Sequence, residues 1–152
     1  MMKIFLATDH AGFEYKEYLK DFLREKHPNF EIQDFGAYEY NSEDDYPDFI
    51  SRLAQELSSL KDSDTRAFIF GGSGQGEAIV ANRYKGVRAA VIACENIDLV
   101  RLAREHNNAN VLSFGARFVS EEFVKEAALL FLDTDFSCES RHARRIAKID
   151  NI

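Results

Sequence analysis

Residues 71–77 of the sequence, GGSGQGE, form a glycine-rich turn that could bind an anion. Four glycines in six positions let backbone N–H groups point toward one ligand and let that ligand approach closely. A helix that begins directly after the turn would add the partial positive charge of its N-terminus. Such a turn can also stabilise an oxyanion that forms during a reaction. A tight turn without a ligand is the alternative, but four glycines after a predicted strand favour the binding role.

Glu77 ends this turn and distinguishes it from two common phosphate-binding motifs. A P-loop needs Lys at this position, and a dinucleotide fingerprint needs Gly. A carboxylate in the first turn of a helix is often no more than a favourable charge near the helix N-terminus. A carboxylate beside an oxyanion hole is a candidate general base. Because both features fall in one turn, we expect Glu77 to be catalytic.

Two histidines lie near predicted strands. Asp9 and His10 follow the strand predicted at residues 3–8, where Asp9 could cap the next helix and His10 could be a surface residue. That interpretation and a functional role are about equally supported. His106 precedes the fifth predicted strand, at the wrong edge for a site within one subunit. It is therefore either a turn residue or a contributor to a neighbouring subunit's site.

The C-terminal segment is basic. Arg141 and Arg145 are four residues apart and share one face of the predicted helix, so together they could bind one phosphate. Arg144 is three residues from Arg141, and its spacing does not exclude it. A solvated basic face, or an interaction with the helix dipole, is the alternative.

The composition limits the class of protein. The chain has 152 residues, 45% of them hydrophobic, which fits one domain over residues 1–152. The net charge of −7 argues against nucleic acid or an anionic membrane as the main partner. No stretch is long and apolar enough to span a bilayer. Cys94 and Cys138 indicate neither a disulfide framework nor a zinc site, so we expect reduced thiols in a cytoplasmic protein.

Short apolar runs alternate with amphipathic stretches along the whole chain. Strands are expected at residues 3–8, 30–35, 66–70, 87–93 and 109–114. Helices are expected at residues 14–26, 47–60, 77–84, 98–105, from 120 onward and at 139–149. The acidic loop at residues 41–45 is expected to be solvated. This order predicts an α/β protein whose five-stranded parallel sheet is covered on both faces. Ligands then bind at the carboxyl ends of the strands, which carry Asp9, the glycine turn and Arg117.

An ordered set of motifs resembles the ribose-5-phosphate isomerase B family over nearly the whole chain. The motifs are Asp9-His10-Ala11-Gly12, Asp45-Tyr46-Pro47, the turn at 71–77 followed by Ala81-Asn82, His106-Asn107, Gly115-Ala116-Arg117, and Arg141-His142 with Arg145. Each motif alone is only moderately specific, but the ordered set is highly specific. The resemblance implies a Rossmann-like three-layer α/β/α fold with an extra C-terminal helix. It also implies a homodimer, or a dimer of such dimers, with sites at the subunit interface.

The resemblance further implies interconversion of ribose 5-phosphate and ribulose 5-phosphate without a cofactor. We also expect no metal requirement, because the motifs offer no ligand cluster and an enediolate route does not need one. One branch of the family uses a cysteine base at the position of Gly71. This chain lacks that cysteine and resembles the other branch, in which a glutamate at the position of Glu77 moves the proton.

The expected roles follow from this resemblance and from the needs of an enediolate route. Glu77 would move the proton, while Asp9 and His106 would help to open the sugar ring. The remaining contacts to the substrate are assigned to His10, Tyr46, Gly72, Ser73, Gly74, Gln75, Gly76, Asn107, Arg117, Arg141 and Arg145. Among them, backbone amides of the turn, helped by Ser73, would hold the oxyanion. Arg117, Arg141 and Arg145, with His10, would bind the phosphate.

Two other functions remain open from the sequence. The substrate could be a six-carbon sugar phosphate, allose 6-phosphate or galactose 6-phosphate. The chain could also be a non-catalytic sugar-phosphate or nucleotide sensor on the same fold. The presence of Glu77 beside the glycine turn argues against a sensor.

Overall fold

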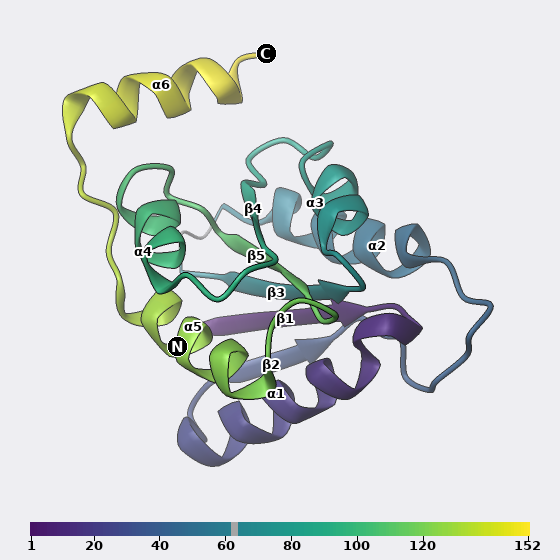
Figure 1. Ribbon diagram of the computed structural model, residues 1–152. Coiled ribbons are helices and arrows are strands. Elements are labelled where there is room, and N and C mark those ends of the chain that lie inside the picture. Colours follow the sequence, from purple (N-terminus) through teal and green to yellow (C-terminus); the bar gives the residue numbers. More distant parts are fainter. Residues whose placement is uncertain (62–63) are drawn as a thin grey trace.

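Five short apolar strands pair into one parallel sheet in the computed structural model, which describes residues 1–61 and 64–152. The strands are β1 (Lys3–Thr8), β2 (Glu31–Asp34), β3 (Arg66–Gly71), β4 (Ala89–Ile92) and β5 (Val111–Gly115), in the order β2-β1-β3-β5-β4 (Figure 1). The order reverses at β1, because the chain first adds β2 on one side and then β3 on the other. The carboxyl ends of β1 and β3 therefore flank the crevice where ligands bind in such sheets.

Alternate residues of the strands enter two separate apolar cores. In β1, Ile4 and Leu6 face one core, and Phe5 and Ala7 face the other. Both faces of the sheet are thus buried, which is why these strands appear in the sequence as continuous apolar runs.

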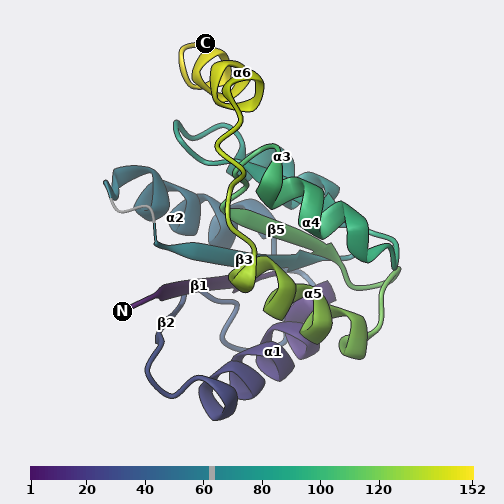
Figure 2. The same ribbon diagram turned by 90° about the vertical axis from the view of Figure 1, so that its left-hand side faces the viewer.

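Helices cover the two faces of the sheet and complete three layers. Helices α1 (Phe13–Lys26), α4 (Ile97–Glu105) and α5 (Glu121–Asp133) pack over one core. Helices α2 (Tyr46–Ser59) and α3 (Gln75–Ala81) pack over the other. Figure 2 shows α1 and α5 on one side of the sheet and α2 on the opposite side. The predicted Rossmann-like α/β/α fold is confirmed.

The C-terminal helix α6 (Ser140–Asp150) stands apart from these layers at the end of an extended segment (Figure 1). Apart from His142 its residues are at least partly exposed. Its mixture of basic and apolar side chains is typical of a helix that packs against another surface. In the described part of the chain no helix is long and apolar enough to cross a membrane.

The predicted element boundaries differ from the observed ones mainly at α3. The sequence predicts a helix from Glu77, whereas the helix begins at Gln75 and ends at Ala81. Gly74 has a φ of 74°, the left-handed conformation that glycine adopts at low cost, and it turns the chain directly into the helix. Gly76 and Glu77 are therefore part of the first helical turn.

Candidate active site

The glycine turn joins β3 to α3 at the carboxyl edge of the sheet. A Cβ at Gly74 would lie 2.8 Å from the Ser113 carbonyl oxygen, so only glycine fits against β5. The Ser113 hydroxyl donates a hydrogen bond of 2.6 Å to the Gly74 carbonyl and holds the turn in place. Ser73 Oγ accepts a hydrogen bond of 3.3 Å from the Gln75 N–H, which leaves the Ser73 hydroxyl proton free to be donated. The turn is therefore a fixed element of the site.

Glu77 is a buried carboxylate at the centre of this edge. The residue is 4% exposed, and a Cβ at Gly71 would overlap its carboxylate atoms. The absence of a side chain at Gly71 thus gives the Glu77 carboxylate its space above the end of β3. Burial raises the pKa of Glu77 above its ordinary value, and the charge of Asp9 adds to the rise. A carboxylate with a raised pKa in a partly desolvated site is suited to accept and return a proton.

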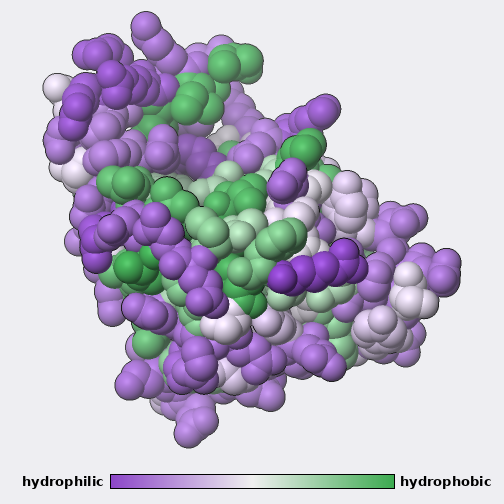
Figure 3. All heavy atoms as spheres, viewed as in Figure 1, coloured by the Kyte–Doolittle hydropathy of each residue, from purple (hydrophilic) through white to green (hydrophobic). Residues whose placement is uncertain are grey.

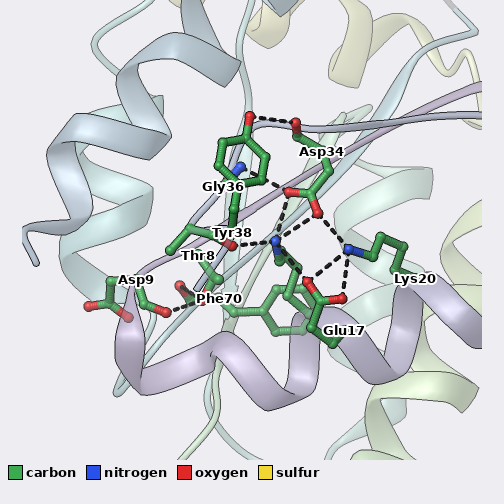
Figure 4. Close-up of polar contacts among 10 residues, drawn as sticks. Thr8, Asp9, Glu17, Lys20, Asp34, Gly36, Tyr38 and Phe70 are labelled. Atoms are coloured by element: carbon green, nitrogen blue, oxygen red, sulfur yellow. Dashed lines mark hydrogen bonds and ion pairs between the residues drawn. The ribbon is translucent and has the colours of Figure 1, made fainter. Parts of the chain in front are cut away.

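Asp9 lies at the end of β1, beside Glu77. Its Oδ1 accepts a hydrogen bond of 2.9 Å from the Ala11 N–H, at the start of a short 3-10 helix, His10–Gly12. The capping role considered from the sequence is thus present. Because Asp9 also lies near Glu77, it both caps the short helix and belongs to the site. The Thr8 hydroxyl fixes this end of β1, because it lies 2.9 Å from the Asp9 carbonyl and 3.2 Å from the Phe70 carbonyl of β3 (Figure 4).

Asp44 is the residue of this site that the sequence analysis missed. Its Oδ1 lies 2.7 Å from His10 Nδ1 and accepts a second hydrogen bond, of 3.0 Å, from the His10 N–H. The expectation that the loop at residues 41–45 is solvated is wrong for Asp44, whose side chain is only 8% exposed. The acidic composition of the loop suggested solvent, and nothing local in the sequence indicates a partner 34 positions away.

A buried lysine fixes the start of the same loop. Lys16 is fully buried, and its Nζ donates to Asp34 Oδ1 at 2.7 Å and to the Ala37 carbonyl at 2.6 Å. Asp34 Oδ1 also accepts a hydrogen bond of 2.9 Å from the Gly36 N–H. Figure 4 shows the Asp34 carboxylate between the Gly36 N–H and the Lys20 side chain. This network anchors the chain just before the loop that carries Asp44 to the site.

Arg117 and Tyr46 close the edge around the turn. The Arg117 guanidinium lies against Gly72, where a Cβ would come within 2.9 Å of its Nη1. The Tyr46 ring, at the start of α2, lies against Gly76 in the same way. The sequence-predicted residues that the structure brings to this edge are Asp9, His10, Tyr46, Gly72, Ser73, Gly74, Gln75, Gly76, Glu77 and Arg117. The side chain of Gln75 is exposed, so its backbone amide is the part that belongs to the turn.

The remaining predicted residues lie elsewhere in the chain. His106 caps the C-terminus of α4, and its ring stacks on His142 of α6 with the centroids 4.2 Å apart. Asn107 follows it at the amino end of β5, on the opposite edge of the sheet from Glu77. Arg141 and Arg145 lie on α6, where Arg141 Nε pairs with Glu139 Oε2 at 3.0 Å. The chain therefore holds the predicted site residues in two separate groups.

Among the described residues, Asp9, His10 and Asp44 form a group with ligand atoms close enough for a metal ion. The sequence spacing gave no sign of it, because Asp44 is distant along the chain. The atoms are already engaged: Asp9 with Ala11, and His10 Nδ1 with Asp44. The hydrogen bond to Asp44 raises the pKa of His10, and the protonated form of an imidazole does not ligate metals.

Comparison with known proteins identifies the family. Residues 4–149 match the Ribose/Galactose Isomerase family, and the chain belongs to that family. It is 36% identical over 145 residues to the ribose-5-phosphate isomerase B of Mycolicibacterium paratuberculosis, covering 95% of this chain and 87% of that protein. It is 38% identical over 146 residues to a probable ribose-5-phosphate isomerase B of Mycoplasma genitalium, covering 96% and 92%.

Solved structures of similar proteins have the same fold. The ribose 5-phosphate isomerase of Thermotoga maritima superposes with a TM-score of 0.88 at 40% identity, covering 99% of both chains. The ribose-5-phosphate isomerase B of Mycoplasma genitalium with bound ribulose-5-phosphate superposes with a TM-score of 0.90 at 35% identity, covering 99% of this chain and 95% of that one.

Proposed function

We propose that this protein interconverts ribose 5-phosphate and ribulose 5-phosphate by proton transfer through an enediolate. The observation that carries the proposal is the Glu77 carboxylate, buried above Gly71 and next to a turn rich in backbone N–H groups. A base beside an oxyanion hole is what an aldose–ketose isomerisation requires. The similarity to the Mycoplasma genitalium enzyme, whose structure holds ribulose-5-phosphate, supports this substrate.

In the reaction, Glu77 takes the proton from C2 of the open-chain aldose and returns it to C1. The backbone amides at residues 72–76 stabilise the negative oxygen of the enediolate, and Ser73 contributes its hydroxyl proton. Because these donors are held by the packing of Gly74 against β5, they need little reorganisation when charge develops. Asp9 helps to open the furanose ring, and Tyr46 lines the pocket.

The substrate preference is tested by a turnover assay. We expect the purified chain alone to convert ribose 5-phosphate with a kcat/KM at least about tenfold above that for allose 6-phosphate or galactose 6-phosphate, because a pocket shaped for five carbons rejects an extra one sterically. A preference for a hexose phosphate would assign the chain to another branch of its family. Binding of all three sugar phosphates without turnover would make it a sensor.

The second half of the site comes, in this proposal, from a second copy of the chain. The edge strand β4 and the flanking helices carry exposed apolar side chains, namely Ile79, Val91, Leu99 and Leu102. Figure 3 shows hydrophobic residues gathered on this face, over β4 and toward α4. A patch of this kind on a water-exposed edge is typical of a subunit interface. A two-fold dimer through this face can set His106, Asn107, Arg141 and Arg145 of each chain against Glu77 of the other.

The phosphate is then bound by Arg117 and His10 of one chain and by Arg141 and Arg145 of its partner copy. We infer a cytoplasmic location from the two free, exposed thiols, Cys94 and Cys138, which a reducing compartment preserves.

The basic face of α6 is tested by two substitutions. We expect Arg141→Ala and Arg145→Ala each to lower kcat/KM for ribose 5-phosphate by about 10- to 100-fold, because a charge-assisted hydrogen bond contributes roughly 1.5–3 kcal/mol. Steady-state kinetics measure the effect. Lys148→Ala is the matched control, since it removes one exposed positive charge from the same helix. Unchanged kinetics in both arginine variants would show that these arginines form only a solvated basic face and do not bind the phosphate.

A further inference from the structure

Asp44 is a buried acid to which neither the family resemblance nor the mechanism above gives a task. One oxygen of its carboxylate accepts both hydrogen bonds from His10, and the other, Oδ2, is buried with no hydrogen-bond partner among the described residues. A carboxylate in this position needs a cation, because an uncompensated buried charge is strongly unfavourable. The group that faces it is the imidazole of His10.

We propose that Asp44 is the positioning residue of the phosphate subsite: it holds His10 as an imidazolium, with Nδ1 bound to the carboxylate and Nε2–H left for the substrate phosphate. This inference rests on the proposed function, in which His10 contacts the phosphate. It extends that function by explaining how His10 is held as a cation. A histidine with the ordinary pKa of 6.5 is mostly neutral above that pH.

The charges around His10 favour this state. The hydrogen bond that His10 donates to Asp44 raises the pKa of His10, and the charges of Asp9 and Asp44 add to the rise, against partial burial and the nearby Arg117. The other ring that faces His10 is Tyr40, which approaches edge-on at 6.1 Å between centroids. Asp9 and Asp44 thus raise the pKa of His10 while Arg117 lowers it, and Asp44 is in direct contact with the ring.

The geometry of the loop makes Asp44 suitable for this role. The loop leaves β2 through the Lys16–Asp34 network, and Asp44 directly precedes the residues that start α2. Both ends of the loop are therefore fixed before substrate arrives. The double contact of Asp44 Oδ1 with the backbone and the ring of His10 then sets the rotation of the imidazole. A preoriented cation binds a phosphate without the cost of ordering a free side chain.

The sign of the pH dependence follows from the raised pKa of His10. The imidazolium persists above the ordinary pKa of 6.5, so its contribution to phosphate binding extends to higher pH than that of an ordinary histidine. That contribution is lost as the pH rises through the raised value. The stabilisation of the fold by the pair has the same direction: it is complete below the unfolded-state pKa and is lost as the pH rises through the folded-state value.

The test is Asp44→Asn, which keeps the shape and a hydrogen-bond acceptor but removes the charge. At pH 7.5 we expect KM for ribose 5-phosphate to rise by about tenfold, the effect of losing one charge-assisted contact, with kcat changed less than about threefold. At pH 6 the two values of KM should approach each other, because a larger fraction of His10 in the variant is then protonated. Glu43→Gln removes an exposed charge from the same loop and should change neither parameter. If Asp44→Asn raised KM by damaging the fold, lowering the pH to 6 would not restore it.

Two further measurements make the outcome decisive. In the His10→Gln background, Asp44→Asn should have no additional effect on KM, because Asp44 acts through His10. Proton NMR should show His10 of the wild-type protein, without substrate, titrating above the ordinary histidine value and falling in Asp44→Asn. A wild-type His10 that titrates at or below that ordinary value would overturn the proposal even if the variant does not fold. Because this titration needs no substrate, it also separates failure of this inference from failure of the proposed isomerase activity.

Discussion

Replacing Glu77 by Gln is expected to lower kcat for ribose 5-phosphate isomerisation by about two to four orders of magnitude, the usual contribution of a general base. Gln fills nearly the same volume above Gly71, so the packing of the turn should survive. It cannot accept a proton from carbon, however. We expect KM to change little, because the phosphate and ring contacts come from other residues. Steady-state kinetics with product detection measure both parameters.

A surface substitution of the same type provides the control for this result. Glu56→Gln changes an exposed residue on α2 and should leave kcat unchanged. The raised pKa of Glu77, caused mainly by burial, also predicts that the acid limb of the rate profile lies above the ordinary range of a glutamate. Activity should fall as the pH falls through that value. A Gln variant within a few-fold of wild type would show that another group is the base.

Mixing two inactive variants should restore activity if the site is shared between two chains. Glu77 lies at the carboxyl edge of the sheet, and His106 lies at the amino edge, stacked on His142. In a mixed dimer of Glu77→Gln and His106→Asn, one site carries both changes and the other is intact. A statistical mixture contains half mixed dimers, each with one working site of two, so about a quarter of wild-type activity should return. Co-refolding of the two variants followed by an activity assay measures it.

The control for complementation uses two residues of the same edge. A mixture of Glu77→Gln with Asp9→Asn should recover nothing, because each site of the mixed dimer would contain one of the two changes. Mass spectrometry establishes that mixed dimers form in both experiments. If mixed dimers form and the His106 mixture stays inactive, the two residues act within the same chain and the proposed dimer is wrong.

Most of the fold could be predicted from the sequence because its signals are local. The strands β1, β3 and β5 are buried on both faces and therefore appear as continuous apolar runs. The start of α3 cannot be predicted from the sequence, because a left-handed glycine can end a turn at any of several positions in GGSGQGE. Only the packing of Gly74 against β5 selects one of them.

The parts of the site that the sequence did not predict depend on distant contacts. Asp44 is in an acidic segment that looks solvated, and its burial follows from the loop path set by Lys16 and Asp34. Lys16 lies on the buried face of α1 together with Leu19 and Leu23, and nothing near it in the sequence shows that a carboxylate of β2, Asp34, compensates its charge. The position of Glu77 at this edge could be predicted because the glycine turn that supports it is adjacent in sequence.

The most direct measurement of the central claim follows hydrogen at C1 of the product. Ribose 5-phosphate is incubated in D₂O with a chelator present, using wild-type protein and Glu77→Gln, and the ribulose 5-phosphate is examined by NMR. We predict that the wild-type protein forms product rapidly and with solvent deuterium at C1, since a carboxylate exchanges the proton it carries between the two carbons. Glu77→Gln should form almost no product. Product whose C1 carries the hydrogen transferred from C2 and no solvent deuterium, formed at a rate that the chelator abolishes, would indicate a metal-assisted hydride shift and would contradict the account.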